Sequence, residues 1–396
     1  MELLENPVRP YAWGSRTVIA ELLGEPVPSP HPQAELWLGA HPGDPSRVAG
    51  GASLLDVLSA APEAQLGPER AERWARTLPF LFKVLAAEEP LSLQAHPSLE
   101  QAQEGYAREN SAGIPLDATH RNYKDPNHKP ELICALTEFH ALVGFREPVE
   151  TLALLRALDV PELGAHVDLL AGQPGPDGLR ALFTTWITLP QGRLDELVPA
   201  VAEGAVRLAG EGRWQEAARS VLELAERYPG DAGVLAALLL NRVTLAPGEA
   251  LYLPAGNLHM YLSGAGVELM ANSDNVLRGG LTPKHVDVPE LLRVLDFEAE
   301  PPPVLTGMPE GAWVRYDTPA EEFLLRRFVG SGPAPVPDGG PRILLCTAGE
   351  AVVATHDTEL ALGKGAAVWL AASDTGATVE PRSPGTQLFL AGDGLS

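Results

Sequence analysis

The stretch from residue 247 to residue 284 concentrates side chains that could do chemistry. Its sequence, PGEALYLPAGNLHMYLSGAGVELMANSDNVLRGGLTPK, places one histidine, His259, after turn-forming glycine and proline, and one carboxylate, Glu268, within an apolar run. Three charged residues follow: Asp274, Arg278 and Lys284. An ordinary strand hairpin needs none of these groups. We therefore predict that this stretch forms one wall of a metal-assisted, anion-binding active site.

A second group of polar residues lies earlier, in the segment LSLQAHP. Ser92, Gln94 and His96 alternate there, and alternate residues of an extended strand project from the same face. A glutamine and a histidine on one inward face can hold a metal or form a hydrogen-bonded pair, and their spacing alone leaves both readings open. The nearby run FLFKVL is typical of a buried strand. Its central Lys83 needs a partner, because burying an unpaired charge is costly.

The segment NYKDPNHKPELICAL favours the metal reading. Its Asp-Pro-Asn turn leads through His128 into a strand, with Lys129 and Glu131 on one face. A carboxylate buried beside Ile133 and Cys134 needs a counter-charge, which a metal would supply.

The lysines are distributed unevenly. Only five of the 29 basic residues are lysine, and four of those lie in these segments: Lys83, Lys124, Lys129 and Lys284. Chance placement on solvated faces is the plain alternative. A compact ammonium whose pKa can be tuned is chemically distinct from a guanidinium, so we interpret these positions as functional.

The elements that must position these groups change along the chain. Short runs broken by proline and glycine predict strands and turns at the start, and residues 53–77 show helical spacing. Apolar residues recur at helical intervals from about Glu147 to Leu240, which predicts an inserted helical domain serving as a lid or scaffold. Strands then return. We expect a mainly β fold of three parts: residues 1–146 with 241–300, residues 147–240, and residues 301–396.

Composition excludes several classes of protein. The net charge of −23 would repel a nucleic-acid backbone. No apolar run approaches the roughly 18 residues that span a membrane, and the start MELLENPVRPYAWG lacks the features of a signal peptide. Two cysteines, Cys134 and Cys346, are too few for a disulfide framework. We expect a cytoplasmic protein without membrane or nucleic-acid partners.

The glycine, proline and histidine spacing of residues 248–259 resembles the second conserved motif of cupin barrels. The usual first motif, His-x-His followed by Glu, is replaced by Gln-x-His with the acidic residue arriving later. Two imidazoles, a carboxylate and an amide oxygen suit Zn²⁺ with at least one position left for water or substrate. The predicted ligands are Gln94, His96, Glu131 and His259.

The C-terminal section contains a divergent copy of the same pattern. Its segment LGKGAAVWLAAS can be laid over LAPGEALYLPAG with Gly365 opposite Gly248, which predicts a second jelly-roll barrel. No histidine follows at the metal position, so we expect a structural role, with His356 in a loop.

Two segments, YKDPNHKPE and HMYLSGAGVELMANSDNVLRGGLTPK, resemble the hallmark motifs of the type I phosphomannose isomerase family. WGS, AELWLGAHP and LSLQAHP match the family as well. The resemblance covers the whole chain, and the C-terminal section is its least diagnostic part. It implies a zinc-dependent enzyme, with one zinc per chain, that interconverts mannose 6-phosphate and fructose 6-phosphate.

The resemblance also implies roles for individual residues. The family's zinc ligands correspond to the four predicted ligands, and its catalytic arginine corresponds to Arg278. Met260 and Gly279 stand where the family usually has alanine, and neither change removes a functional group. The other implied active-site residues are Lys83, Ser92, His128, Lys129, Glu268, Asp274 and Lys284.

The implied reaction opens the sugar ring and moves a proton between C2 and C1 through a cis-enediol. A metal would polarise the reacting oxygens, and Arg278 could stabilise an oxyanion or clamp a substrate oxygen. Glu268 is our first choice of base, because burial in an apolar run would raise its pKa. His128 or Lys129 could open the ring or act as the acid. For the phosphate we expect Ser92 and Lys284, with Lys83 behind them.

Two other classes remain open. An iron-dependent cupin dioxygenase would share the barrel and the metal, although such enzymes prefer more histidine ligands. A non-catalytic sugar-phosphate sensor would keep the phosphate contacts without needing the full ligand set or Arg278. We expect a monomer whose partner is a small sugar phosphate.

Overall fold

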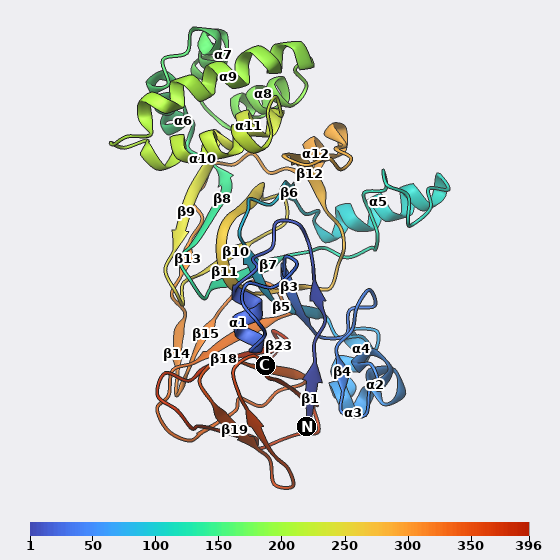
Figure 1. Cartoon of the computed structure of the whole chain (residues 1–396). Helices are drawn as coiled ribbons and strands as arrows, with labels where there is room; N and C mark the ends of the chain where they lie inside the picture. The colour runs from blue at the N-terminus through green and yellow to red at the C-terminus, as the bar shows by residue number, and fades with distance from the viewer. Residues whose placement is uncertain (396) are drawn as a thin grey trace.

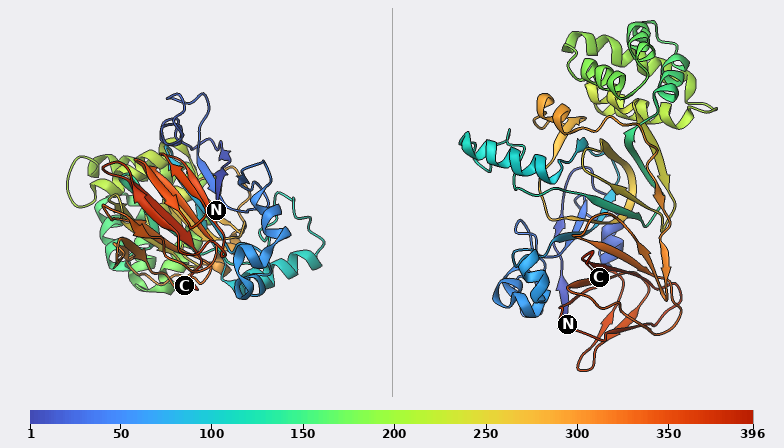
Figure 2. Two further views of the ribbon diagram at one scale, coloured as in Figure 1. Left: turned by 90° about the horizontal axis from the view of Figure 1, so that it is seen from below. Right: turned by 180° about the vertical axis from the view of Figure 1, so that it is seen from behind.

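The computed structural model describes residues 1–395 and shows a mainly β protein with a helical insertion. Figure 1 shows helices at one end, a curved sheet in the middle and a second β region at the other end, where both termini lie. The view from behind in Figure 2 shows the same three tiers. The predicted fold class is confirmed. No helix within residues 1–395 is long and apolar enough to cross a membrane.

The central sheet has eleven antiparallel strands organised around β11 (His259–Ala271). The first half of β11 pairs with β6 and β8, and the second half pairs with β5 and β7. The other strands are β2 (Val8–Arg9), β3 (Glu35–Leu38), β5 (Phe80–Ala87), β6 (Leu93–Ala95), β7 (Glu131–Ala135), β8 (Phe139–Phe145), β9 (Leu240–Leu245), β10 (Ala250–Leu253), β12 (Leu277–Gly280) and β13 (Val304–Leu305).

A bend in β11 lets one strand serve both halves of the sheet. The register with β8 shifts between Tyr261 and Ser263, and Gly264 follows with φ of +114°. A Cβ at Gly264 would lie 2.5 Å from the carbonyl oxygen of Glu138, so only glycine fits this close approach. The bend curls the sheet, as a cupin-type barrel requires.

The helical insertion packs against the back of the strands that carry predicted metal ligands. Leu93 and Ala95, which flank Gln94, are buried in the same apolar cluster as the helices, and so is Met260, the neighbour of His259. The insertion therefore acts as a scaffold for β6 and β11. It consists of α6 (Pro148–Ala157), a short 3₁₀ turn (Pro161–Leu163), α7 (Gly164–Gly172), α8 (Pro176–Ile187), α9 (Gln191–Leu208), α10 (Gln215–Arg227) and α11 (Ala232–Ala237).

The remaining helices lie around the central sheet. Those predicted within residues 53–77 form three short pieces, while α5 begins with a capping box between Ser98 and Gln101. Their bounds are α1 (Val18–Leu23), α2 (Leu54–Ala60), α3 (Pro62–Leu66), α4 (Pro68–Arg73), α5 (Leu99–Ser111) and α12 (Val288–Val294).

The C-terminal region is built from two sheets of eight and four strands. Gly365 and Gly248 both have positive φ, +84° and +88°, and each is followed two residues later by a four-residue strand. This local likeness agrees with the predicted repeat, which stays a prediction, and His356 lies in an exposed loop. The strands are β14 (Met308–Glu310), β15 (Trp313–Tyr316), β16 (Leu324–Phe328), β17 (Ala334–Pro335), β18 (Arg342–Ala348), β19 (Ala351–Ala354), β20 (Glu359–Leu362), β21 (Ala367–Leu370), β22 (Thr378–Pro381) and β23 (Gln387–Gly392).

Strand pairing crosses the predicted domain boundaries. The N-terminal strands β1 (Glu2–Glu5) and β4 (Arg47–Val48) join the eight-stranded C-terminal sheet, while β13 pairs with β10 of the central sheet. The division at residues 146, 241 and 300 stays a prediction. Both cysteines are buried free thiols.

Candidate active site

Three of the four predicted metal ligands meet inside the central barrel. His96, Glu131 and His259 offer ligand atoms that all lie within 4.8 Å of one another, and all three residues are buried. His96 Nε2 lies 3.4 Å from Glu131 Oε1, and His259 Nε2 lies 3.5 Å from Glu131 Oε2. The side chains converge from β11, from the first residue of β7 and from the residue after β6.

Gln94 completes the set from the middle of β6. It lies opposite His259 on β11 and opposite Arg278 on β12, so the three residues form a row across neighbouring strands. Its Nε2 is 3.5 Å from His259 Nε2. A half-turn of the amide would bring its oxygen to the same place, where it could serve as a metal ligand.

Hydrogen bonds on the outer side of the two imidazoles prepare them for a metal. His96 Nδ1 lies 2.7 Å from the carbonyl oxygen of Asn275, and His259 Nδ1 lies 3.1 Å from that of Asn257. A carbonyl can only accept, so each Nδ1 donates and each Nε2 presents a lone pair to the cluster. Burial lowers the pKa of His96 to about 4, which keeps the ring neutral at pH 7.

Two buried polar atoms of the cluster have no hydrogen-bond partner among the described residues: His96 Nε2 and Glu131 Oε2. Leaving such atoms unsatisfied costs about 1–3 kcal/mol each, so their lack of a partner needs an explanation. Two imidazole nitrogens with carboxylate and amide oxygens form a donor set that suits zinc. The residues present therefore fit the expected metal.

The carboxylate of Glu131 is held ionised by its surroundings. Burial raises its pKa, but nearby His96 and Lys129 outweigh that effect and hold the pKa well below its ordinary value. Lys129 Nζ lies 3.2 Å from Glu131 Oε1. The structure thus places Lys129 directly beside Glu131, a predicted metal ligand.

Hydrogen bonds of Asn275 join its own turn to the turn at residues 124–127. Asn275 donates from Nδ2 to the carbonyl oxygens of Asp125 and Asn127, at 2.8 Å each, and its Oδ1 accepts from the backbone N–H of Lys124 at 2.7 Å. Its own carbonyl accepts from His96. Asn275 was missed as a site residue, although the Ser-Asp-Asn motif that contains it was the available signal.

A second buried group surrounds Glu268. Glu268 Oε2 lies 3.4 Å from Lys83 Nζ, and Oε1 accepts a hydrogen bond from Tyr261 at 2.9 Å. Burial is the largest effect on Glu268 and raises its pKa to about 7, although Lys83 opposes the rise. The Tyr261 ring also lies 6.1 Å from that of His259, so this group adjoins the predicted metal ligands. Tyr261 gave no signal in the sequence beyond an apolar strand position.

Two cations of the predicted site have no carboxylate partner within residues 1–395: Arg278, which lies opposite Gln94 in β12, and Lys284, in the loop after β12. Burial lowers the pKa of Arg278, and burial together with Arg278 lowers that of Lys284, so the two charges lie near each other. Ser92, half-buried at the start of the same segment as Gln94, has a hydroxyl that bonds to no described residue. Two neighbouring cations without carboxylate partners suit an anion.

The structure does not bring every predicted active-site residue to the candidate metal ligands. His128 faces the C-terminal region, where its Nε2 lies 2.6 Å from Glu322 Oε1. Asp274 lies 3.4 Å from Nε2 of buried His41, and His41 was not predicted. Because Gly43 N–H donates to His41 Nδ1, it is Nε2 that donates to Asp274 and lowers the pKa of that carboxyl.

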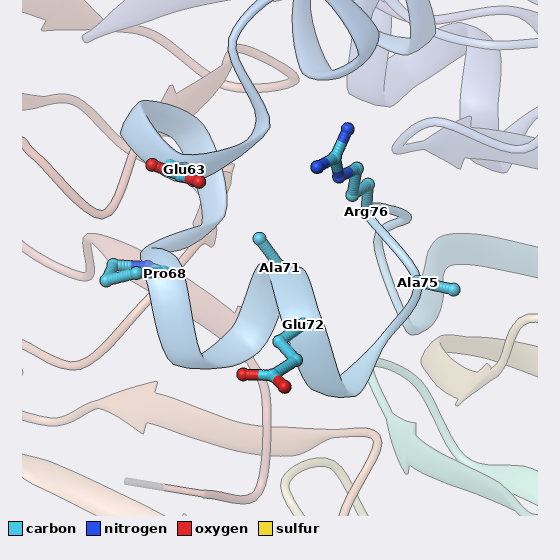
Figure 3. Close-up of a pocket in the computed structure, with 6 residues that line it drawn as sticks. All are labelled: Glu63, Pro68, Ala71, Glu72, Ala75 and Arg76. Carbon is cyan, nitrogen blue, oxygen red and sulfur yellow. The ribbon is translucent and has the colours of Figure 1, made fainter.

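One surface hollow lies away from these residues. It has a volume of about 620 Å³ and follows α3 and α4 (Figure 3). None of the predicted site residues lines it. The lining residues are Glu63, Pro68, Ala71, Glu72, Ala75 and Arg76.

A mainly β barrel that gathers two histidines, a glutamate and a glutamine in its interior defines a metal protein of the cupin type. The family model described as the catalytic domain of type I phosphomannose isomerase matches residues 1–148. The chain is 41% identical to mannose-6-phosphate isomerase of Escherichia coli, over 96% of this chain and 97% of that one. It is 33% identical to mannose-6-phosphate isomerase 1 of Arabidopsis thaliana, over 89% and 85% of the two chains.

Solved structures agree. A lysine-to-alanine variant of phosphomannose isomerase from Salmonella typhimurium matches with a TM-score of 0.91 and 37% identity, covering all of both chains. A zinc-bound mannose 6-phosphate isomerase matches with a TM-score of 0.91 and 37% identity, covering 100% of this chain and 99% of that one. The chain belongs to the type I phosphomannose isomerase family.

Proposed function

We propose that this chain interconverts mannose 6-phosphate and fructose 6-phosphate by moving a proton between C2 and C1 of the open-chain sugar. One observation carries the proposal. A buried group of two histidines and a glutamate that could hold a metal shares one barrel with a buried carboxylate outside that group, Glu268. Arg278 and Lys284, which lie near each other, have no carboxylate partner within residues 1–395. These are the parts that an aldose–ketose isomerisation of a phosphorylated sugar requires.

The metal site would be formed by Gln94, His96, Glu131 and His259. Zinc, when bound, would polarise the carbonyl and hydroxyl oxygens at C1 and C2 of the substrate. The protein holds its ligands through the Asn275 and Asn257 carbonyls, which fix the rotation of the two imidazoles.

The proton is carried by Glu268. Its pKa of about 7 means that the carboxylate can accept a proton and give it back near neutral pH. Tyr261 holds one oxygen of Glu268, so the carboxylate keeps its orientation during the transfer. Lys129, beside Glu131, is positioned to assist ring opening or to act as the acid partner.

Arg278 and Lys284 hold the charged part of the substrate. Arg278 lies beside Gln94 and stays protonated, so it can stabilise a developing oxyanion or clamp a substrate oxygen. Lys284 lies farther along the chain and, with the hydroxyl of Ser92, would bind the phosphate. We assign no phosphate contact to Lys83, because it pairs with two buried carboxylates, Glu35 and Glu268.

A coupled assay tests the proposal. Zinc-loaded protein should form fructose 6-phosphate from mannose 6-phosphate, and a chelator should abolish the reaction until zinc is restored. A His259→Ala variant should show neither the activity nor the zinc. Absence of isomerisation by the zinc-loaded protein would refute the proposal, and iron in place of zinc would favour a cupin dioxygenase. Substrate binding without turnover would favour a sensor. A monomeric state and a cytoplasmic location stay predictions.

A further inference from the structure

Glu35 lies in the segment AELWLGAHP, which the proposed function leaves without a role. Its carboxylate faces the same ammonium as the proposed base. Lys83 Nζ lies 3.3 Å from Glu35 Oε1 and 3.4 Å from Glu268 Oε2, and all three side chains are buried. Two buried carboxylates around one ammonium repel each other, and each charge is costly to bury, so simple pairing of Lys83 does not explain the second one.

Strand β3 fixes Glu35 from its other side. Trp37 Nε1 donates to Glu35 Oε2 at 2.7 Å, and Lys83 Nζ lies 5.5 Å from the centre of the Trp37 ring. Trp37 is paired directly opposite Lys83 in the β3–β5 register, and Glu268 is opposite Lys83 in the β11–β5 register. Three adjacent strands thus place Glu35 and Glu268 on either side of one cation.

The ammonium of Lys83 interacts with two carboxylates at once. With Glu35 present, the ammonium is shared between two carboxylates, so its attraction for Glu268 is weakened. Glu35 also repels the charge on Glu268 through the barrel interior, and raises its pKa as burial does. The groups that face Glu268 from neighbouring elements are Lys83, Glu35, Glu131, Lys129 and Tyr261.

We infer that Glu35 is a positioning residue for the isomerisation: it holds Lys83 away from exclusive pairing with Glu268 and so keeps Glu268 able to accept a proton. The inference rests on the proposed function. Glu35 has no oxygen left for the substrate, because its two oxygens are occupied by Lys83 and Trp37.

The test is Glu35→Gln, which keeps the size of the side chain and an oxygen to accept from Trp37 or Lys83 but removes the charge. We expect kcat to fall about tenfold, with KM changed by less than about twofold and zinc content unchanged. The acid limb of the kcat profile should move to lower pH, because Lys83 would then stabilise ionised Glu268 alone. Glu35→Asp, which keeps the charge, should restore the position of the limb.

Glu310→Gln is the matched control, since Glu310 is a carboxylate paired with buried Arg326 in the C-terminal region. It should leave kcat and the acid limb unchanged. If Glu35→Gln does not fold, Trp37→Phe replaces it. That change frees Glu35 Oε2 to pair with Lys83 and should move the acid limb to higher pH. Wild-type protein without activity would refute the proposed function. Active wild type whose kcat and acid limb are unaffected by these changes would refute only the role of Glu35.

Discussion

Glu131 and Glu268 are buried in the same barrel, yet their pKa values shift in opposite directions. Glu131 adjoins His96 and Lys129, which outweigh burial and hold its pKa well below the ordinary value. For Glu268 burial prevails and raises the pKa to about 7. Two carboxylates with divergent pKa values divide the work between them. Glu131 stays ionised and can hold a metal, while Glu268 can exchange a proton.

Replacement of Glu268 tests this division. The base works in its ionised form, so in the wild type kcat should fall as the pH drops below about 7. Glu268→Gln should lower kcat by about 100-fold or more and remove this limb of the profile. Proton exchange at C2, followed by isotope incorporation from the solvent, should cease, while metal analysis still finds one zinc per chain. Near-normal exchange at C2 would exclude Glu268 as the base.

At the scale of elements, close contact between α5 and the segment before β7 positions the Asp-Pro-Asn turn. Gly105 of α5 faces the ring of fully buried Tyr123, and a Cβ there would overlap the ring. Tyr123 is held in place because its N–H donates to Glu109 and its hydroxyl to Glu290. Helix, turn and ligand strand therefore form one packed unit.

Gly105→Ala should destabilise the protein by about 1–3 kcal/mol, because overlap with a fixed ring outweighs the gain in helix propensity. The free energy of unfolding can be measured by denaturant titration. Gly192→Ala in α9 is the matched control: no atom lies within 4 Å of its added Cβ, so this change should be neutral or stabilise by up to about 1 kcal/mol. Equal stability of the two variants would contradict the packing argument.

At the scale of the whole molecule, the ligand cluster ties together segments that are far apart in the sequence. His96 and Glu131 precede the helical insertion, and His259 follows it. The C-terminal region also reaches the catalytic barrel, through Glu322 against His128 and through Tyr316, whose hydroxyl donates to the carbonyl oxygen of Gly248 at 2.6 Å. A metal bound by these residues should therefore stabilise the fold in addition to assisting the reaction.

Zinc should raise the midpoint of thermal unfolding, since a ligand that binds only the folded state stabilises it by about 2.7 kcal/mol at a free concentration 100 times its Kd. Scanning calorimetry of chelated and zinc-loaded protein measures the difference. His259→Ala, which lacks one ligand, should lose most of this response. A midpoint that does not depend on zinc in the wild type would show that the cluster does not bind the metal tightly.

The sequence by itself determined which residue types could do chemistry and most of the architecture. Alternation in LSLQAHP, the Asp-Pro-Asn turn and the change to helical periodicity are local signals, because strand, turn and helix geometry impose them within a few residues. They were enough to predict the four candidate ligands, the helical insertion and the divergent second β region. The resemblance to a known family supplied the substrate and the role of Arg278.

Only the tertiary structure decided which side chains meet. Lys83 was expected behind the phosphate, but strand register places it between Glu35 and Glu268. Tyr261 and His41 look like ordinary strand and loop residues until the fold brings them to Glu268 and Asp274. The physical reason is that the register between strands distant in the chain determines which side chain lies beside a buried charge. The spacing of residues within one segment does not reveal that register.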